Sequence, residues 1–196
     1  MSSPKAITRE DILAFDDYAA SRKERKRALT AVKKDRRMEV GPHATFYFEN
    51  YETMWNQIHE MLYIERGGEN QIPDELAAYN PLIPQGRELV ATVMFEIGDA
   101  DRRAKVLATL GGIEETIFIT VGDEKIMGVP EIDVDRTNAD GKASSVQFVH
   151  FPFTDSQVIA FSAGEADVSV GFSHDSYAHT AGMPAAVRAA LSKDFD

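Results

Sequence analysis

The 196-residue sequence contains no cysteine. This absence excludes a disulfide framework, a thiolate zinc site, an iron–sulfur cluster held by the chain itself and a cysteine nucleophile. The opening residues Met1 to Lys5 include no apolar run of the kind found in a secretory signal, and no window approaches the roughly 18 uninterrupted apolar residues of a membrane span. We therefore expect neither a signal peptide nor a transmembrane helix, and we expect a cytoplasmic location.

Glycine motifs for nucleotide binding are missing as well. Neither a P-loop nor a G-x-G-x-x-G sequence occurs, and there is no G-x-S-x-G nucleophile elbow. The pair Gly111-Gly112 follows a predicted helix rather than a strand, which is the wrong context for a phosphate cradle. The sequence therefore requires no cofactor and indicates no particular catalytic chemistry.

What the chain does contain is the composition of a globular protein, with 43% hydrophobic and 27% charged residues. At this length about 70% of the surface of the unfolded chain can be buried, so the fold needs no metal or disulfide. No internal repeat and no low-complexity linker divides the sequence. We expect residues 1–196 to form a single domain.

Charge is distributed unevenly along the chain. Residues 1–40 contain eleven Lys and Arg against seven Asp and Glu, a balance of +4. Residues 41–196 contain ten against twenty-five, a balance of −15. The larger part of the protein should therefore repel nucleic acid and anionic membranes, whereas the first 40 residues need not.

Residues 1–79 are predicted to be mainly helical, because N-cap residues precede apolar residues at helical spacing. A short aromatic strand at Phe46–Phe48 is the exception. The expected helical segments begin near residue 9 after Thr8, span 21–37 before Gly41-Pro42, run from Asn50 to Gly67-Gly68, and cover 73–79.

Residues 88–174 are predicted to be rich in strands, because their apolar residues alternate with a period of two. The predicted strands are 89–97, 116–121, 125–129, 145–153 and 166–174, and the second and third of them are predicted to form a hairpin around Gly122-Asp123. Helices are predicted at 99–111, 154–163 and 184–192, with a loop at 138–141. The expected fold class is α+β, in which a helical N-terminal portion packs on an antiparallel β-sheet of four to six strands.

The helical segment 21–37 contains nine Lys and Arg residues, and its few apolar residues cover barely one turn. Such a helix is either solvated or laid over an acidic surface. We interpret it as a docking element for an acidic face of another protein, and the candidate binding residues are Arg22, Lys23, Arg25 and Lys26. A weaker alternative is a contact with nucleic acid, which the negative charge of the remaining chain opposes.

The helix 50–66 carries two further candidate binding residues, Gln57 and Glu60, beside its apolar stripe. It lacks the Glu-x-x-His pairs of a di-iron bundle, because Asn56 stands three residues before His59. The alternative role for both candidates is hydrogen bonding to buried backbone groups, such as those of the loop 80–84.

Two histidines at predicted strand ends are candidate metal ligands. Period-two alternation places His150 and His174 each on an apolar strand face. If the two strands are neighbours, the imidazoles converge. With His179 and a carboxylate such as Asp175 or Glu60 they can then bind a metal ion that keeps an open position. The alternative is that each imidazole is hydrogen-bonded at the end of its own strand.

Several short segments form a joint pattern over nearly the whole chain. They are Phe48-Glu49-Asn50, Thr53-Met54, Gln57-Ile58-x-Glu60-Met61-Leu62-x-x-Glu65-Arg66, Asn80-Pro81-Leu82-Ile83-Pro84, Gly112-Ile113-Glu114, Ser145-Val146-x-Phe148 and His174-x-x-Tyr177. This pattern resembles a bacterial family without an assigned function, the domain of unknown function 3501. The resemblance implies a redox or oxidative-stress context, because members are often encoded beside rubrerythrin-like proteins and iron–sulfur oxidoreductases. It supplies no catalytic residue, and it adds Tyr177 to the candidate binding residues.

The leading hypothesis is a non-catalytic accessory or binding protein of a bacterial redox system, which docks on another protein through its N-terminal helices. The resemblance implies a rubrerythrin-like or iron–sulfur oxidoreductase partner. The first alternative is a metal-binding protein or metalloenzyme with histidine and carboxylate ligands. The second and weaker alternative is a regulator that contacts nucleic acid through the basic helix.

Overall fold

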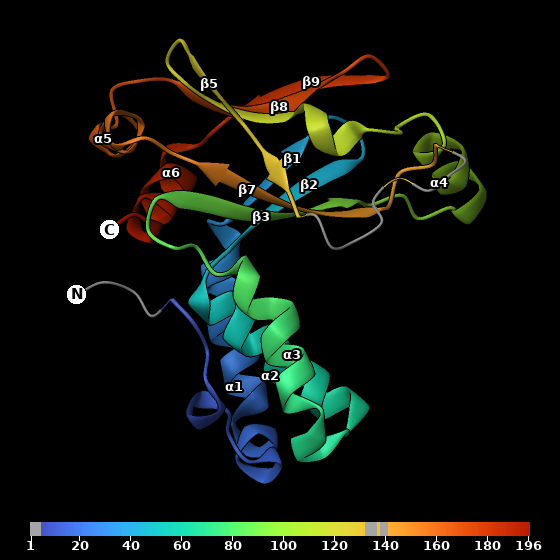
Figure 1. Ribbon diagram of the computed structural model, residues 1–196, viewed down its shortest axis with the longest axis vertical. Helices are drawn as coiled ribbons and strands as arrows, with labels where there is room; N and C mark the ends of the chain where they lie inside the picture. The colour runs from blue at the N-terminus through green and yellow to red at the C-terminus, as the bar shows by residue number, and fades with distance from the viewer. Residues whose placement is uncertain (1–4, 132–136, 138–140) are drawn as a thin grey trace.

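The computed structural model describes residues 5–131, 137 and 141–196. Two antiparallel sheets face each other, and a group of helices extends from the outer face of one sheet along the long axis of the molecule (Figure 1). We call this group the arm; its helices are α1 (Phe15–Lys34), α2 (Tyr51–Glu65) and α3 (Ile72–Tyr79).

The sheet that supports the arm has five strands in the order β1-β2-β3-β7-β6, all antiparallel. Its strands are β1 (Arg37–Val40), β2 (Ala44–Glu49), β3 (Glu88–Phe95), β7 (Val146–Pro152) and β6 (Val129–Pro130). The opposing sheet has four strands in the order β5-β4-β8-β9. They are β5 (Glu124–Met127), β4 (Ile117–Val121), β8 (Val168–His174) and β9 (Tyr177–Gly182).

The main hydrophobic core fills the space between the two sheets. Side chains alternate between the faces of each strand, so Phe46 and Phe48 of β2 and Phe151 of β7 point toward the opposing sheet. Phe172 of β8 meets them from the other side, and the ring centroids of Phe46 and Phe172 lie 5.3 Å apart. This packing of two inner faces makes the strand region a sandwich.

The arm has a smaller core of its own, which is continuous with the outer face of the five-stranded sheet. Ile58 and Met54 of α2 pack there with Val90 of β3. Asn50 caps α2, since its side chain accepts a hydrogen bond from the amide of Thr53 at 2.9 Å. The other members of this core are Ile7, Ile12, Ile72, Leu82 and Ile83.

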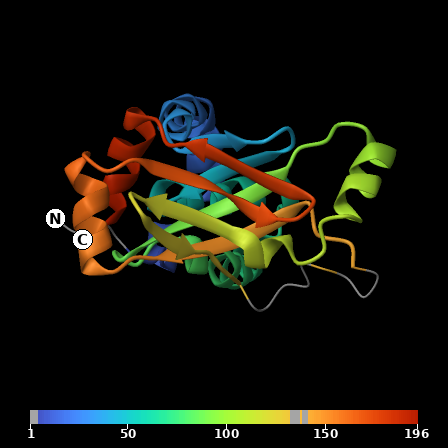
Figure 2. The same ribbon diagram turned by 90° about the horizontal axis from the view of Figure 1, so that it is seen from above.

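The remaining helices lie at the two ends of the sandwich, with α5 and α6 at one end and α4 at the other (Figure 2). Their bounds are α4 (Ala100–Leu107), α5 (Asp155–Ala163) and α6 (Ala185–Leu191). Short 3-10 turns are η1 (Arg9–Asp11), η2 (Gly68–Asn70), η3 (Asn80–Leu82), η4 (Ile113–Thr116) and η5 (Ser192–Asp194). Among the described residues, no helix combines the length and the apolar content that crossing a lipid bilayer requires.

The predicted α+β fold is confirmed, with helices packed on antiparallel strands. The predicted hairpin around Gly122-Asp123 is the pair β4–β5, and the C-terminal helix forms at α6. The strands divide into two facing sheets, which their alternation could not indicate. The predicted loop at 138–141 falls mostly on residues outside the described ranges.

Two N-terminal predictions are wrong in their boundaries. The basic helix ends at Lys34, and residues 37–40 form strand β1, because Met38 and Val40 alternate into the core (5% and 0% exposed). The helix expected near residue 9 is the short turn η1, and α1 begins only at Phe15. Strand β9, which follows the predicted sheet region, was not expected either.

A pair of isoleucines on α2 tests the arm core. Ile58 is fully buried, whereas Ile64 on the same helix is 64% exposed. Burying an unpaired carboxylate costs several kcal/mol. We expect Ile58→Asp to lower the melting temperature by roughly 10 °C or more, and Ile64→Asp to change it by no more than about 2 °C. Equal melting temperatures for the two variants, measured by thermal unfolding, would show that this packing is wrong.

Candidate functional site

The basic helix α1 packs on α2 through a stripe that includes arginine side chains. Tyr18 is buried in this contact, and Arg22 and Arg25 follow it at helical spacing. The guanidinium of Arg22 lies 4.4 Å from the ring centroid of Tyr63, and that of Arg25 lies 4.7 Å from the ring of Trp55. Arginine stems and cation–π contacts therefore take the place of aliphatic side chains in this interface.

Glu60 of α2 is the centre of the contact between the two helices. Its Oε1 accepts hydrogen bonds from the Tyr18 hydroxyl at 2.7 Å and from Arg22 Nε at 2.8 Å. Its Oε2 accepts from the second nitrogen of Arg22 at 2.8 Å and from Lys26 Nζ at 3.0 Å. The hydrogen bonds from Arg22 are the largest cause that lowers the pKa of Glu60 to about 2, while burial opposes the change. Glu60 is therefore an anion at neutral pH and holds two cations of α1 in place.

Beside this contact, four basic residues of α1 line a shallow groove of about 500 Å³, which we call the basic groove. They are Arg22, Lys23, Lys26 and Arg27, and Tyr63 of α2 forms another part of its wall. Lys23 and Arg27 are exposed and form no ion pair within the described part of the chain. The charge of Arg22 and Lys26 is partly balanced by Glu60, so Lys23 and Arg27 are the cations left for a ligand.

The candidate binding residues Arg25 and Gln57 make contacts elsewhere in the arm. Arg25 lies over Trp55 and donates to the hydroxyl of Ser21 at 2.9 Å. Gln57 contacts the hydroxyl of Tyr79 on α3 at 3.5 Å, rather than a backbone group of the loop 80–84. The structure thus brings Arg22, Lys23, Lys26 and Glu60 together, and it does not bring Arg25 or Gln57 to the same place.

Tyr177 of β9 joins the two sheets. Its hydroxyl accepts hydrogen bonds from the amides of His43 (2.9 Å) and Ala44 (3.0 Å) and donates to the carbonyl of Val40 (2.8 Å). All three partners belong to the β1–β2 hairpin of the opposing sheet, whose turn at Gly41 (φ +67°) leaves no room for a side chain beside the Tyr177 hydroxyl. In this position the hydroxyl is fully engaged in holding the sheets together.

His150 of β7 lies between two carboxylates on the outer face of the five-stranded sheet. Its Nδ1 is 3.0 Å from Glu88 and its Nε2 is 3.5 Å from Glu131. The hydrogen bond with Glu88 is the first cause that raises the pKa of His150, and Glu131 adds to it, while burial opposes both. Only the imidazolium, with a proton on each nitrogen, can satisfy both carboxylates at once.

The structure does not bring His150 and His174 together. Their strands, β7 and β8, belong to different sheets, so the condition for a shared ion is not met. His174 accepts a hydrogen bond from the amide of Ser176 at 3.1 Å and contacts the carbonyl of Gly111 at 3.2 Å. His179 packs against the ring of Tyr177 instead, and Asp175 is an exposed turn residue. Within the ranges that the structure describes, no group of three or more His, Asp or Glu residues is arranged to hold a metal ion.

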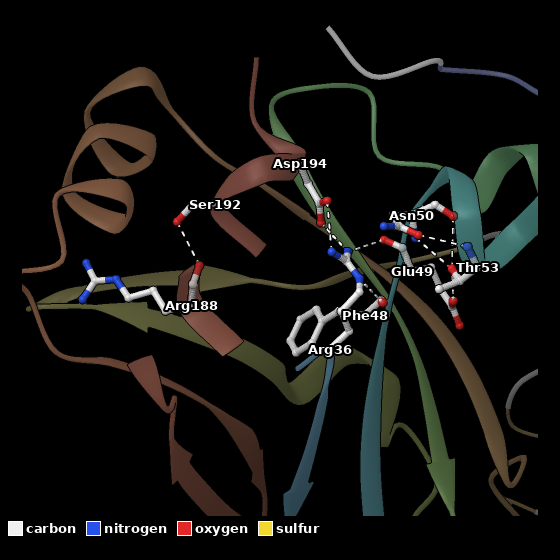
Figure 3. A network of polar contacts seen from close by, with 8 residues as sticks. All are labelled: Arg36, Phe48, Glu49, Asn50, Thr53, Arg188, Ser192 and Asp194. Carbon is white, nitrogen blue, oxygen red and sulfur yellow. Dashed lines mark hydrogen bonds and ion pairs between the residues drawn. The ribbon is translucent and has the colours of Figure 1, made fainter. Parts of the chain in front are cut away.

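Sequence reasoning missed Arg36, which is buried between α1 and β1. Its guanidinium forms two contacts with Asp194 of η5, at 2.5 and 3.2 Å, and donates to the carbonyls of Phe48 (3.0 Å) and Glu49 (2.9 Å) (Figure 3). Burial raises the pKa of Asp194, and the guanidinium opposes that rise. In the sequence, Arg36 is one of nine basic residues in a run; the only signal that sets it apart is the alternating Met38 and Val40 after it.

Glu49 completes this junction, and its carboxylate is held by hydroxyl groups. Its two oxygens accept hydrogen bonds from Thr53 at 2.6 Å and from Thr92 at 2.8 Å. Thr53 in turn pairs with Asn50 in the cap of α2 (Figure 3). The segment Phe48 to Thr53, part of the pattern noted in the sequence, therefore joins the arm to the sandwich.

A family model described as "Protein of unknown function (DUF3501)" matches residues 6–195. A crystal structure of a protein of unknown function from Burkholderia pseudomallei K96243 is similar, with a TM-score of 0.90 and 36% sequence identity over 97% of this chain and 100% of that chain. No curated protein matches the sequence. The similarity thus extends over the arm and the sandwich together.

The Glu60 contact predicts a stability that depends on pH. The folded-state pKa is about 2, below the ordinary value of 4.5, so the contribution of Glu60 is complete above that ordinary value and is lost as the pH falls toward 2. We expect Glu60→Gln to lower the free energy of unfolding by roughly 2–3 kcal/mol at pH 7 and by less than half as much at pH 3. Urea unfolding at both pH values measures this, with the exposed Glu65→Gln as the control. A loss that is independent of pH would contradict the ion-pair assignment.

The surroundings of His150 predict the opposite pH dependence. Because its pKa is raised, its contribution to stability is present below the ordinary value of 6.5 and is lost as the pH rises through the elevated folded value. In an NMR titration of the imidazole, we expect Glu88→Gln to lower the pKa of His150 more than Glu131→Gln does. The melting temperatures of the wild type and of His150→Gln should converge between pH 6 and pH 9; a constant difference would count against the paired imidazolium.

Proposed function

The chain belongs to the DUF3501 family of proteins of unknown function, and we propose that it is a non-catalytic accessory protein that binds an acidic segment of another protein in the basic groove of the arm. The observation that carries this proposal is the pair of exposed cations, Lys23 and Arg27, beside Arg22 and Lys26 in one groove. Cations of this kind attract carboxylates over several ångströms and guide a partner into register.

The geometry of the groove is set before a partner arrives. Glu60 fixes Arg22 and Lys26 through three hydrogen bonds of 2.8 to 3.0 Å. The guanidinium of Arg22 also packs on the ring of Tyr63, 4.4 Å from the ring centroid. A partner that binds there does not have to order these two long side chains, so less conformational entropy is lost on binding. The side chains that line the groove offer cations and hydroxyls, which suit recognition rather than bond making.

The contrast between the groove and the rest of the chain favours a protein partner over nucleic acid. Residues 41–196 carry a balance of −15, so a long polyanion beside the arm would meet repulsion. A short acidic segment on a folded partner can reach the groove alone. The partner that the family resemblance implies is a rubrerythrin-like or iron–sulfur oxidoreductase protein of a bacterial redox system.

The test is a pair of double variants with equal changes in charge. Lys23→Gln/Arg27→Gln removes the two cations of the groove that form no ion pair with another described residue, and Arg102→Gln/Lys105→Gln removes an exposed Arg and Lys from α4. Each variant is used to co-purify the partner protein from extracts of the native cells. We expect the first variant to recover at least fivefold less partner than the wild type, equivalent to about 1 kcal/mol of binding free energy. The control should recover the wild-type amount, and the wild-type interaction should weaken with added salt.

Both variants should keep the wild-type melting temperature within about 2 °C, because exposed side chains contribute little to stability. Equal recovery of partner by the two variants would refute the groove as the binding site. Recovery that disappears after nuclease treatment would refute the protein partner in favour of nucleic acid.

A further inference from the structure

Helix α1 begins and helix α2 ends at the end of the arm farthest from the sheets (Figure 1). Residues of both helices line a second hollow there, which we call the arm-tip pocket. Its volume is about 440 Å³, within the range of small-molecule sites. Apolar side chains from the segment between η1 and α1, and from α1, α2 and α3, meet there. Those that form most of its wall are Ile12, Leu13, Phe15, Leu62, Tyr63 and Ile72.

Two residues of the pocket carry polar atoms that are already engaged within the arm. His59 accepts a hydrogen bond at Nε2 from the amide of Leu13 (3.0 Å), and its Nδ1 donates to the carbonyl of Trp55 (2.7 Å), so the ring is the neutral tautomer. Burial lowers the pKa of His59, which keeps it neutral. The hydroxyl of Tyr18 donates to Glu60. These rings therefore offer apolar surface and no free hydrogen-bonding atom, and the part of a ligand against them must be apolar.

The rim of the pocket carries one cation that lacks a carboxylate. Arg66 caps α2 and is exposed, and it forms no ion pair with the described residues; its guanidinium lies 5.8 Å from the ring of Phe15. The other charged residue at the rim, Glu69, is already bound by Arg9 through hydrogen bonds of 2.5 and 2.9 Å. The net charge available to a ligand is therefore the single positive charge of Arg66.

The backbone at Arg66 is unusual for an arginine. Its φ is +57°, a left-handed conformation that glycine adopts freely and other residues adopt rarely, and no other non-glycine residue with positive φ occurs in the described ranges. Glycine would end α2 at this position without strain, and Gly68 two residues later adopts a similar φ of +67°. A strained arginine whose side chain stands at the rim of an apolar pocket is a candidate for function.

We propose that the arm-tip pocket binds a small organic anion that combines an aromatic or branched apolar body with one acid group. The body lies against Phe15, Leu62 and Tyr63, and the acid group pairs with Arg66. An apolar pocket with a single placed cation is the arrangement that selects such a molecule over a neutral or strongly polar one. The proposal does not depend on the basic groove, whose free cations Lys23 and Arg27 do not line this pocket.

The single tryptophan of the chain provides the readout. The ring of Trp55 lies 3.7 Å from the ring of His59 in the pocket wall. The probe is 1-anilinonaphthalene-8-sulfonate, an aromatic monoanion, added to the intact protein while energy transfer from Trp55 is followed. We expect saturable binding of one probe per chain. Arg66→Gln and Phe15→Ala should each weaken it at least fivefold, whereas the matched surface variants Arg102→Gln and Ile159→Ala should leave it unchanged.

Two further measurements separate ligand binding from folding. Arg66→Gly should weaken the probe at least fivefold while the melting temperature stays equal or rises, because glycine relieves the backbone at this position. N-phenyl-1-naphthylamine, which lacks the sulfonate, should bind the wild type at least fivefold more weakly than the anion does, and should bind Arg66→Gln as it binds the wild type. The double variant Lys23→Gln/Arg27→Gln should bind the anionic probe normally.

The proposal is overturned if the anionic probe shows no saturable site, or if Arg66→Gln and Phe15→Ala bind it as the wild type does. It is also overturned if the neutral probe binds as tightly as the anion, since Arg66 would then not favour an anionic ligand over a neutral one. Loss of partner binding in the basic groove variant with normal probe binding supports both sites separately.

Discussion

The arm depends on one partly buried carboxylate, that of Glu60. Helix α1 has too few apolar residues to be held on α2 by hydrophobic burial alone, and Glu60 provides the missing attraction by accepting hydrogen bonds from Tyr18, Arg22 and Lys26. Such a contact is strong because the carboxylate is largely shielded from water. All three of its partners are hydrogen-bond donors, and two of them are cations. The basic groove lies on one side of this contact, and Tyr18 continues from it into the arm-tip pocket. Both candidate sites therefore rest on the position that Glu60 gives to α1.

At its other end the arm is tied to the sandwich by Arg36. This side chain bonds Asp194 near the C-terminus and two carbonyls at the end of β2, so three segments far apart in the sequence meet at one guanidinium. A buried arginine needs most of its donors satisfied, and the planar fork of the guanidinium can reach a carboxylate and carbonyls at the same time. Arg36 thus holds the base of the arm, and the exposed cations of the basic groove and the open apolar pocket lie farther along it. A well-supported arm that carries exposed cations and an open apolar pocket suits a protein that binds other molecules.

Local patterns were sufficient for the strands and helices whose signals lie in neighbouring residues. The capped helix after Asn50, the hairpin around Gly122-Asp123 and the final helix all appear where capping, turn and periodicity predicted them. Strand β1 was missed because its four residues follow a basic helix without a break in composition, and its partner β2 decides its conformation. Of the candidate site, the sequence identified the basic cluster, but it could not distinguish Arg22, which packs inward, from Lys23, which is exposed. Both are cations at adjacent positions, and only the direction of each side chain relative to α2 separates them.

The sequence by itself determined the α+β class, the positions of most elements, the asymmetry of charge and the absence of thiol chemistry, because composition and short-range periodicity carry that information. The tertiary structure decided which strands are neighbours. It placed His150 and His174 in different sheets, and it gave the Tyr177 hydroxyl three backbone partners across the sandwich. It assembled the arm-tip pocket from two distant stretches of the chain, residues 12–18 and 59–72. Such contacts join residues that are tens of positions apart, and their distances follow from how the elements pack rather than from spacing along the chain.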